Sequence, residues 1–180
     1  VQGALLGLVG LLLAFGLSMA VGRYDTRREL VVHEANAIGT TYLRARLLDE
    51  PQRTASLDLI ERYTDEAIVF AHQVPGSAQF KASSARMEAI QEELWTLAAD
   101  AMDAVPTGSA SRLYVETLNE TIDAHSSRAA SMNNRVPPSV MWLLILGSAV
   151  AVAALSLYLT LLGKGLATSL VATAVLLVTL

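Results

Sequence analysis

The sequence contains no cysteine, and almost no charge lies outside its central part. The absence of cysteine excludes disulfide bonds and thiolate metal sites throughout these 180 residues. No Asp, Glu, Lys, Arg or His occurs in Val1–Val21, Met141–Leu162 or Leu166–Leu180, and Lys164 is the one charged residue outside Gly22–Val136. Proton pumps, many ion-coupled transporters and intramembrane enzymes place ionisable residues inside the membrane. The sequence therefore disfavours these classes and leaves a passive pore or a membrane anchor.

The first two uncharged runs are long enough to cross a membrane. They contain 21 and 22 residues, and a bilayer core about 30 Å thick needs roughly 20 apolar residues in a helix. The third run, Leu166–Leu180, reaches only about 22 Å as a helix. With 53% of its residues hydrophobic, the chain is predicted to be an integral membrane protein with one polar domain.

Four segments are expected along the chain. They are a transmembrane helix at 1–22, a helical domain at 23–136, a second transmembrane helix at 137–163 and a third, truncated one at 164–180. The first run has no basic residues before it and is long for the apolar part of a signal peptide, so we interpret it as a span. We expect the native chain to begin before Val1 and to continue beyond Leu180.

Arginines flank the first two apolar runs on the side of the central block. Arg23, Arg27 and Arg28 follow the first run, and Arg128 and Arg135 precede the second, whereas the opposite side carries a single lysine. Basic residues near membrane spans concentrate on the cytoplasmic side. The arginines therefore predict a cytoplasmic central domain.

The central block is acidic and carries no recognisable catalytic motif. Of the 13 basic residues in the chain, 12 lie in the block, and its 17 acidic residues give it a net charge of −5. This acidity disfavours nucleic acid as a partner. His33, His72 and His125 show no metal-ligand spacing, and no nucleophile elbow or phosphate loop is present. We predict no enzyme activity, no cofactor and no metal site.

Turn signals divide the central block into four predicted helices, of which the first continues from the membrane run. These signals are Asp49-Glu50-Pro51, Val74-Pro75-Gly76-Ser77, Pro106-Thr107-Gly108-Ser109 and Pro137-Pro138. Each helix has an apolar stripe: Val31, Ala35, Ile38, Tyr42; Leu57, Ile60, Tyr63, Ala67, Phe70; Met87, Ile90, Leu94, Leu97, Ala101; and Val115, Leu118, Ile122, His125, Ala129, Met132. The predicted fold is all-α, with transmembrane helices and a cytoplasmic helical bundle.

The first apolar run has features of a helix that packs around an axis. Gly3 and Gly7 form a G-x-x-x-G pair, which lets membrane helices approach closely. Leu11, Phe15 and Met19 recur every four residues and so share one helix face. In several copies around an axis they form stacked apolar rings, which gate ions by dewetting. The alternative is ordinary contact with lipid or with neighbouring helices.

A polar stretch at Glu34–Arg44 contains residues that form helices poorly, among them Asn36 and Thr41. Something other than helix propensity favours these residues. We predict that Glu34, Asn36 and Thr41 line a polar vestibule. A hydrogen-bond network inside the domain is the alternative. His125 lies on an apolar stripe, which is typical of a core residue rather than a pH sensor.

Several segments of the sequence resemble the bestrophin-like bacterial integral membrane proteins, a family catalogued as a domain of unknown function. Glu34–Arg44 is the most specific of them. The others are Gly10-Leu11-Leu12-Leu13-Ala14-Phe15, Ser18-Met19-Ala20, Arg27-Arg28, Pro51-Gln52-Arg53, Leu94-Trp95, Leu118-Asn119, Arg128 and Arg135-Val136-Pro137-Pro138. The family usually has a further span before the first run and an Asp- and Pro-containing segment after the last, and this sequence contains neither.

The resemblance implies a multi-pass protein of the bacterial inner membrane. Bestrophins proper are pentameric anion channels with an apolar neck on a pore-lining helix. The implied partners are therefore further copies of the chain, as in a pentamer, together with lipid and inorganic ions. Val1–Val21 would line the pore, with Leu11, Phe15 and Met19 as neck residues. Anion or cation preference stays open, and the alternative function is a membrane-anchored helical signalling or scaffold protein without transport activity.

Overall fold

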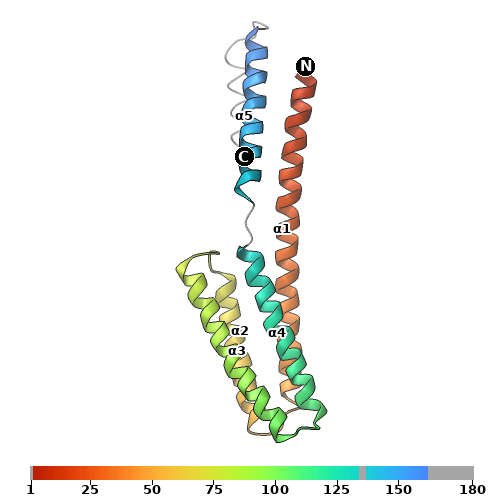
Figure 1. The fold of residues 1–180 in the computed structure, drawn as a ribbon, viewed down its shortest axis with the longest axis vertical. Coiled ribbons are helices and arrows are strands. Elements are labelled where there is room, and N and C mark those ends of the chain that lie inside the picture. The colour runs from red at the N-terminus through yellow and green to blue at the C-terminus, as the bar shows by residue number, and fades with distance from the viewer. Residues whose placement is uncertain (1, 134–136, 162–180) are drawn as a thin grey trace. The chain divides into compact units, whose positions relative to one another are not determined.

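The computed structural model describes residues 2–133 and 137–161, and every element in these two ranges is an α-helix (Figure 1). The helices are α1 (Gln2–Ala45), α2 (Gln52–Ala71), α3 (Ala78–Ala104), α4 (Ser109–Asn133) and α5 (Pro138–Leu161). The all-α prediction is confirmed for these residues. The segment predicted as a third transmembrane helix, 164–180, lies outside the described residues.

The helices belong to two compact units. One unit comprises Val1–Tyr24 with Arg135–Leu180, and the other comprises Asp25–Asn134. Among the described residues, one stretch is long and apolar enough to cross a membrane, and it ends at Tyr158 in α5. We call the two parts the apolar unit and the bundle unit.

Turn chemistry explains where the helices of the bundle unit begin. The Glu50 carboxylate accepts hydrogen bonds from the Thr54 backbone N–H at 3.2 Å and from Arg53 Nη2 at 2.7 Å, so it caps the start of α2. Ser77 precedes α3, and its hydroxyl accepts from the Phe80 N–H at 3.0 Å. Gly76, one residue earlier, has φ of 83°, a left-handed conformation that favours glycine. The predicted breaks before α2 and α3 are therefore confirmed.

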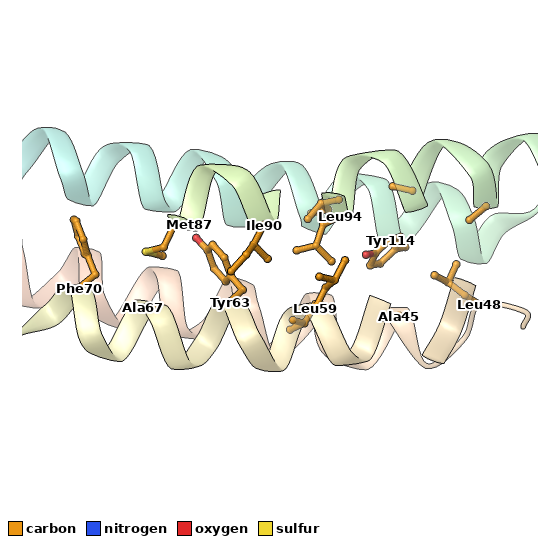
Figure 2. Packing of buried hydrophobic residues seen from close by; sticks show 14 of the residues in the cluster. Ala45, Leu48, Leu59, Tyr63, Ala67, Phe70, Met87, Ile90, Leu94 and Tyr114 are labelled. Atoms are coloured by element: carbon orange, nitrogen blue, oxygen red, sulfur yellow. The ribbon is translucent and has the colours of Figure 1, made fainter. Parts of the chain in front are cut away.

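The core of the bundle unit is apolar where α2 packs beside α3 (Figure 1). Figure 2 shows Tyr63, Ala67 and Phe70 of α2 facing Met87 and Ile90 of α3, all of them buried. Burying one such large side chain stabilises a fold by about 1.5–3 kcal/mol. Four of the five predicted stripe positions of α2 are buried, and Leu57 is partly buried. Met87, Ile90, Leu94 and Ala101 confirm most of the stripe of α3.

The apolar stripe predicted for the bundle part of α1 was wrong in part. Ile38 and Tyr42 are partly buried against the core. The structure leaves Val31 and Ala35 exposed and buries Glu34, Ala37 and Thr41 in their place. The buried face of α1 is thus rotated around the helix by about one residue position from its most hydrophobic face. A polar side chain is buried at low cost only when it is hydrogen-bonded, and α4 supplies the required partners.

The same shift occurs on α4, where the predicted stripe was wrong in part. Leu118 and His125 are buried as predicted, whereas the other members of that stripe are only partly buried. The remaining buried positions of α4 include four polar residues, Ser111, Thr117, Thr121 and Arg128. The contact between α1 and α4 is therefore a polar seam, in contrast to the apolar packing between α2 and α3.

Candidate functional site

Two groups of residues are candidates for function, one in each unit. In the apolar unit, the predicted neck residues are exposed on α1: Leu11 is 53%, Phe15 59% and Met19 39% accessible. Their spacing of four residues places them along one side of the helix. No described residue of the apolar unit buries them, so this side of α1 is open to a further molecule or to lipid.

A different side of α1 packs against α5 within the apolar unit. A Cβ atom at Gly147 would lie 3.2 Å from Leu12 Cδ1, and one at Gly16 would lie 3.7 Å from Leu144 Cδ1. Glycines at both positions let the two helices approach closely. A groove beside this contact is lined by Leu12, Leu13, Gly16, Leu17, Ala20, Leu144 and Ser148. None of the neck residues lines it.

The structure does not bring the three predicted vestibule residues together on one surface. Glu34 and Thr41 are each only 1% exposed and face the interior of the bundle unit, whereas Asn36 is exposed. Thr41 Oγ1 lies 2.8 Å from Thr121 Oγ1 and donates to the Thr117 carbonyl oxygen at 2.9 Å. Thr41 thus contributes to the polar seam between α1 and α4. The vestibule role of Asn36 stays a prediction.

Glu34 is the centre of a buried polar cluster that joins three helices. His125 Nδ1 lies 3.1 Å from Glu34 Oε1, and Tyr63 donates to the same oxygen at 3.4 Å. Arg128 Nη1 donates to the other carboxylate oxygen, Oε2. Gln91 of α3 donates to the Tyr63 hydroxyl oxygen at 3.1 Å, which adds the fourth helix to the network. A carboxylate only accepts, so His125 carries its proton on Nδ1.

Aromatic rings enclose the charged groups of this cluster. The guanidinium carbon of Arg128 lies 5.2 Å from the centre of the Phe70 ring, within range of a cation–π interaction. The Phe70 and His125 ring centres are 5.3 Å apart. Both side chains of the Arg128–Glu34 ion pair are buried, so its charges interact more strongly than at the surface. The pair links α1 to α4 across 94 residues of sequence.

Two nitrogens in the cluster have no hydrogen-bond partner among the described residues. They are His125 Nε2 and Arg128 Nε, and both are buried. A buried donor without an acceptor costs about 1–3 kcal/mol. Because His125 donates through Nδ1, its neutral form leaves only a lone pair at Nε2, whereas a second proton there would add an unpaired N–H.

The hydrogen bonds of the cluster control the ionisation of its acidic members. Burial by itself raises the pKa of Glu34, but the hydrogen bonds from His125 and Arg128 outweigh it and hold this pKa below the ordinary 4.5. Burial, and next the charge of Glu34, raises the pKa of Tyr63. Glu34 is therefore ionised and Tyr63 protonated at neutral pH, as the direction of their hydrogen bond requires.

The lowered pKa of Glu34 predicts a specific acid sensitivity. Since the folded state binds this proton more weakly than the unfolded state, the stabilisation is present above pH 4.5 and is lost as the pH falls through the folded-state pKa. We expect the wild type in detergent to lose more free energy of unfolding than Glu34→Gln between about pH 5.5 and pH 3. Glu120→Gln, which changes an exposed carboxylate on α4, is the control and should follow the wild type. Parallel pH profiles of wild type and Glu34→Gln would contradict this assignment.

Sequence reasoning did not assign roles to Arg128, Tyr63 and Gln91 in this cluster. The available signal was a charged residue, Arg128, three positions after His125 on a helix with an apolar stripe. Such spacing places both residues on one face. In the described residues, no three His, Asp or Glu side chains are arranged to hold a metal ion. The hydrogen bonds of the cluster join the helices of the bundle unit.

Comparison with known proteins identifies a family for this chain. The sequence model described as the Bestrophin-like domain matches residues 3–180. No curated protein and no solved structure matches the chain. The family match includes both candidate groups of residues, the neck face of α1 and the Glu34 cluster.

Proposed function

This chain belongs to the Bestrophin-like family, and from that premise we propose that it is an ion channel built from several copies of itself. Family membership supports a location in a membrane and an oligomeric assembly. In the proposal, the apolar segments 1–22, 137–163 and 164–180 span the inner membrane of a bacterium, with the bundle unit in the cytoplasm. The channel is passive and has no enzyme activity.

The neck face of α1 is the observation that carries this proposal. Leu11, Phe15 and Met19 are exposed on α1, and none of them lines the groove beside the contact with α5. Copies of α1 around an axis, five as in bestrophins, convert these side chains into apolar rings. A narrow apolar ring resists wetting and so controls the passage of ions. The uncharged sequence Val1–Val21 supports such a pore, because an apolar ring needs no fixed charge.

Reconstitution of the purified protein in planar bilayers tests the proposal. We expect ion currents in KCl and an annular particle when the protein is imaged along the membrane normal. A monomeric particle, or the absence of current across a range of salt concentrations and pH values, would refute the channel. That result would leave a membrane-anchored helical signalling or scaffold protein as the function. Since the chain has no cysteine, single cysteines in the bundle unit can show by thiol labelling whether it faces the cytoplasm.

A further inference from the structure

An exposed polar face runs along α1 within the bundle unit. Glu29, His33, Asn36 and Thr40 are all exposed, and their spacing of four, three and four residues places them on one side of the helix. An adjacent side of the helix carries the buried residues of the polar seam described above. Among the described residues, neither Glu29 nor His33 forms a hydrogen bond or ion pair through its side chain. No helix of the bundle unit covers this face.

A seven-residue spacing in the sequence includes members of this face and the neck residue Phe15. Phe15, Gly22, Glu29, Asn36 and Leu43 follow each other at steps of seven residues in a single helix, α1. Seven residues make nearly two turns of α-helix, and the side chains drift by only about 20° at each step. The seven-residue sequence pattern that includes Phe15 therefore also includes Glu29 and Asn36.

The charge of this face is negative. Glu29 is the one acidic residue of this face. The other three residues are His33, Asn36 and Thr40. Asp25 and Arg28 border it, and both line a shallow hollow shared with Glu29, His33 and Asn36. Arg28 balances Asp25, so the charge left over in the hollow is that of Glu29. Carboxylate rings in channels attract cations and repel anions.

We propose that Glu29, His33, Asn36 and Thr40 form the cytoplasmic wall of the ion path, and that Glu29 gives this path a preference for hydrated inorganic cations. This inference rests on the proposed channel function and deepens it. The amide of Asn36 and the hydroxyl of Thr40 offer oxygens to water around the ion, and Thr40 also donates to the Asn36 carbonyl at 2.9 Å. Around an axis, each copy adds one Glu29 carboxylate to a ring.

The ion selectivity of the intact channel tests the proposal. In a KCl gradient we expect the wild-type reversal potential to lie toward that of K⁺. Glu29→Gln should move it toward zero, with a several-fold fall in the K⁺ to Cl⁻ permeability ratio, and Glu29→Asp should retain most of the preference. Glu88→Gln changes an exposed carboxylate on α3 and is the matched control. An anion-selective wild type, or an unchanged ratio in Glu29→Gln, would overturn the cation assignment while the channel itself stands. Absence of any current would overturn both.

A cysteine substitution tests the position of the wall independently of selectivity. In this cysteine-free chain, Asn36→Cys should react with a cationic methanethiosulfonate reagent added from the cytoplasmic side, and the reaction should reduce the current. Asn119→Cys places the same thiol on an exposed position of α4, where we expect labelling without loss of current. Equal inhibition of both variants, or full current after complete labelling of Asn36→Cys, would contradict the assigned wall.

Discussion

We expect Arg128→Met to lower the free energy of unfolding by about 3–5 kcal/mol. The substitution keeps most of the side-chain volume but removes the guanidinium, and so leaves the Glu34 carboxylate buried without its charge partner. Both side chains are almost fully buried, with 5% of Arg128 and 1% of Glu34 accessible. Denaturation in detergent, followed by far-ultraviolet circular dichroism, measures the loss.

Two further variants separate the effect of the buried charge on the free energy of unfolding from a general loss of stability. Arg86→Met breaks the ion pair of Arg86 with Glu66, which has a distance of 2.8 Å but an arginine side chain that is 55% exposed. Its expected cost is much smaller than that of Arg128→Met, because solvent screens an exposed pair. Adding Glu34→Gln to Arg128→Met should recover part of the stability, since the amide oxygen still accepts from His125 without a buried charge. Equal costs for Arg128→Met and Arg86→Met would show that the cluster is not held by this pair.

Phe15→Ala should increase the single-channel conductance several-fold. Phe15 is the middle member of the neck face and is 59% exposed on α1. Shortening it widens the proposed apolar ring and lowers the dewetting barrier for ions. Single-channel recording in planar bilayers measures the change, and particle size in detergent shows whether the assembly is intact.

Leu17→Ala is the matched control for the neck. Leu17 is also apolar and exposed, at 67%, but it lines the groove beside the contact with α5 rather than the neck face. We expect its conductance to stay within the spread of the wild type. If Leu17→Ala raised the conductance as much as Phe15→Ala, the pore would not be lined by the side of α1 proposed above.

The helices and the apolar packing of α2 with α3 were predictable from the sequence. Turn residues such as Pro51 and Ser77 act within a few residues of their own position, so their effect can be read locally. The stripe from Ile60 to Phe70 is buried because hydrophobic side chains need no specific partner to leave water. The spacing of Leu11, Phe15 and Met19 likewise predicted a shared helix face, and the structure leaves all three side chains exposed. Their role as a neck stays a prediction.

The polar seam between α1 and α4 was not predictable from hydrophobic periodicity. Glu34 is buried because His125 and Arg128, 91 and 94 residues later in the sequence, supply the hydrogen bonds that offset its desolvation. The periodicity of α1 pointed to Val31 and Ala35, which have no such partners and remain exposed. Likewise, Thr41 is buried because Thr117 and Thr121 face it.

The sequence by itself determined the all-helical character, the separation of apolar and polar segments, and the family. These features depend on composition and on the spacing of residues within one segment, so each segment can be interpreted without the others. Only the tertiary structure decided which face of α1 turns inward, and therefore that Glu34 stabilises the bundle while Glu29 stays on an open face. The physical reason is that the cost of burying a charge depends on partners distant in the sequence, and folding alone brings them within hydrogen-bond distance.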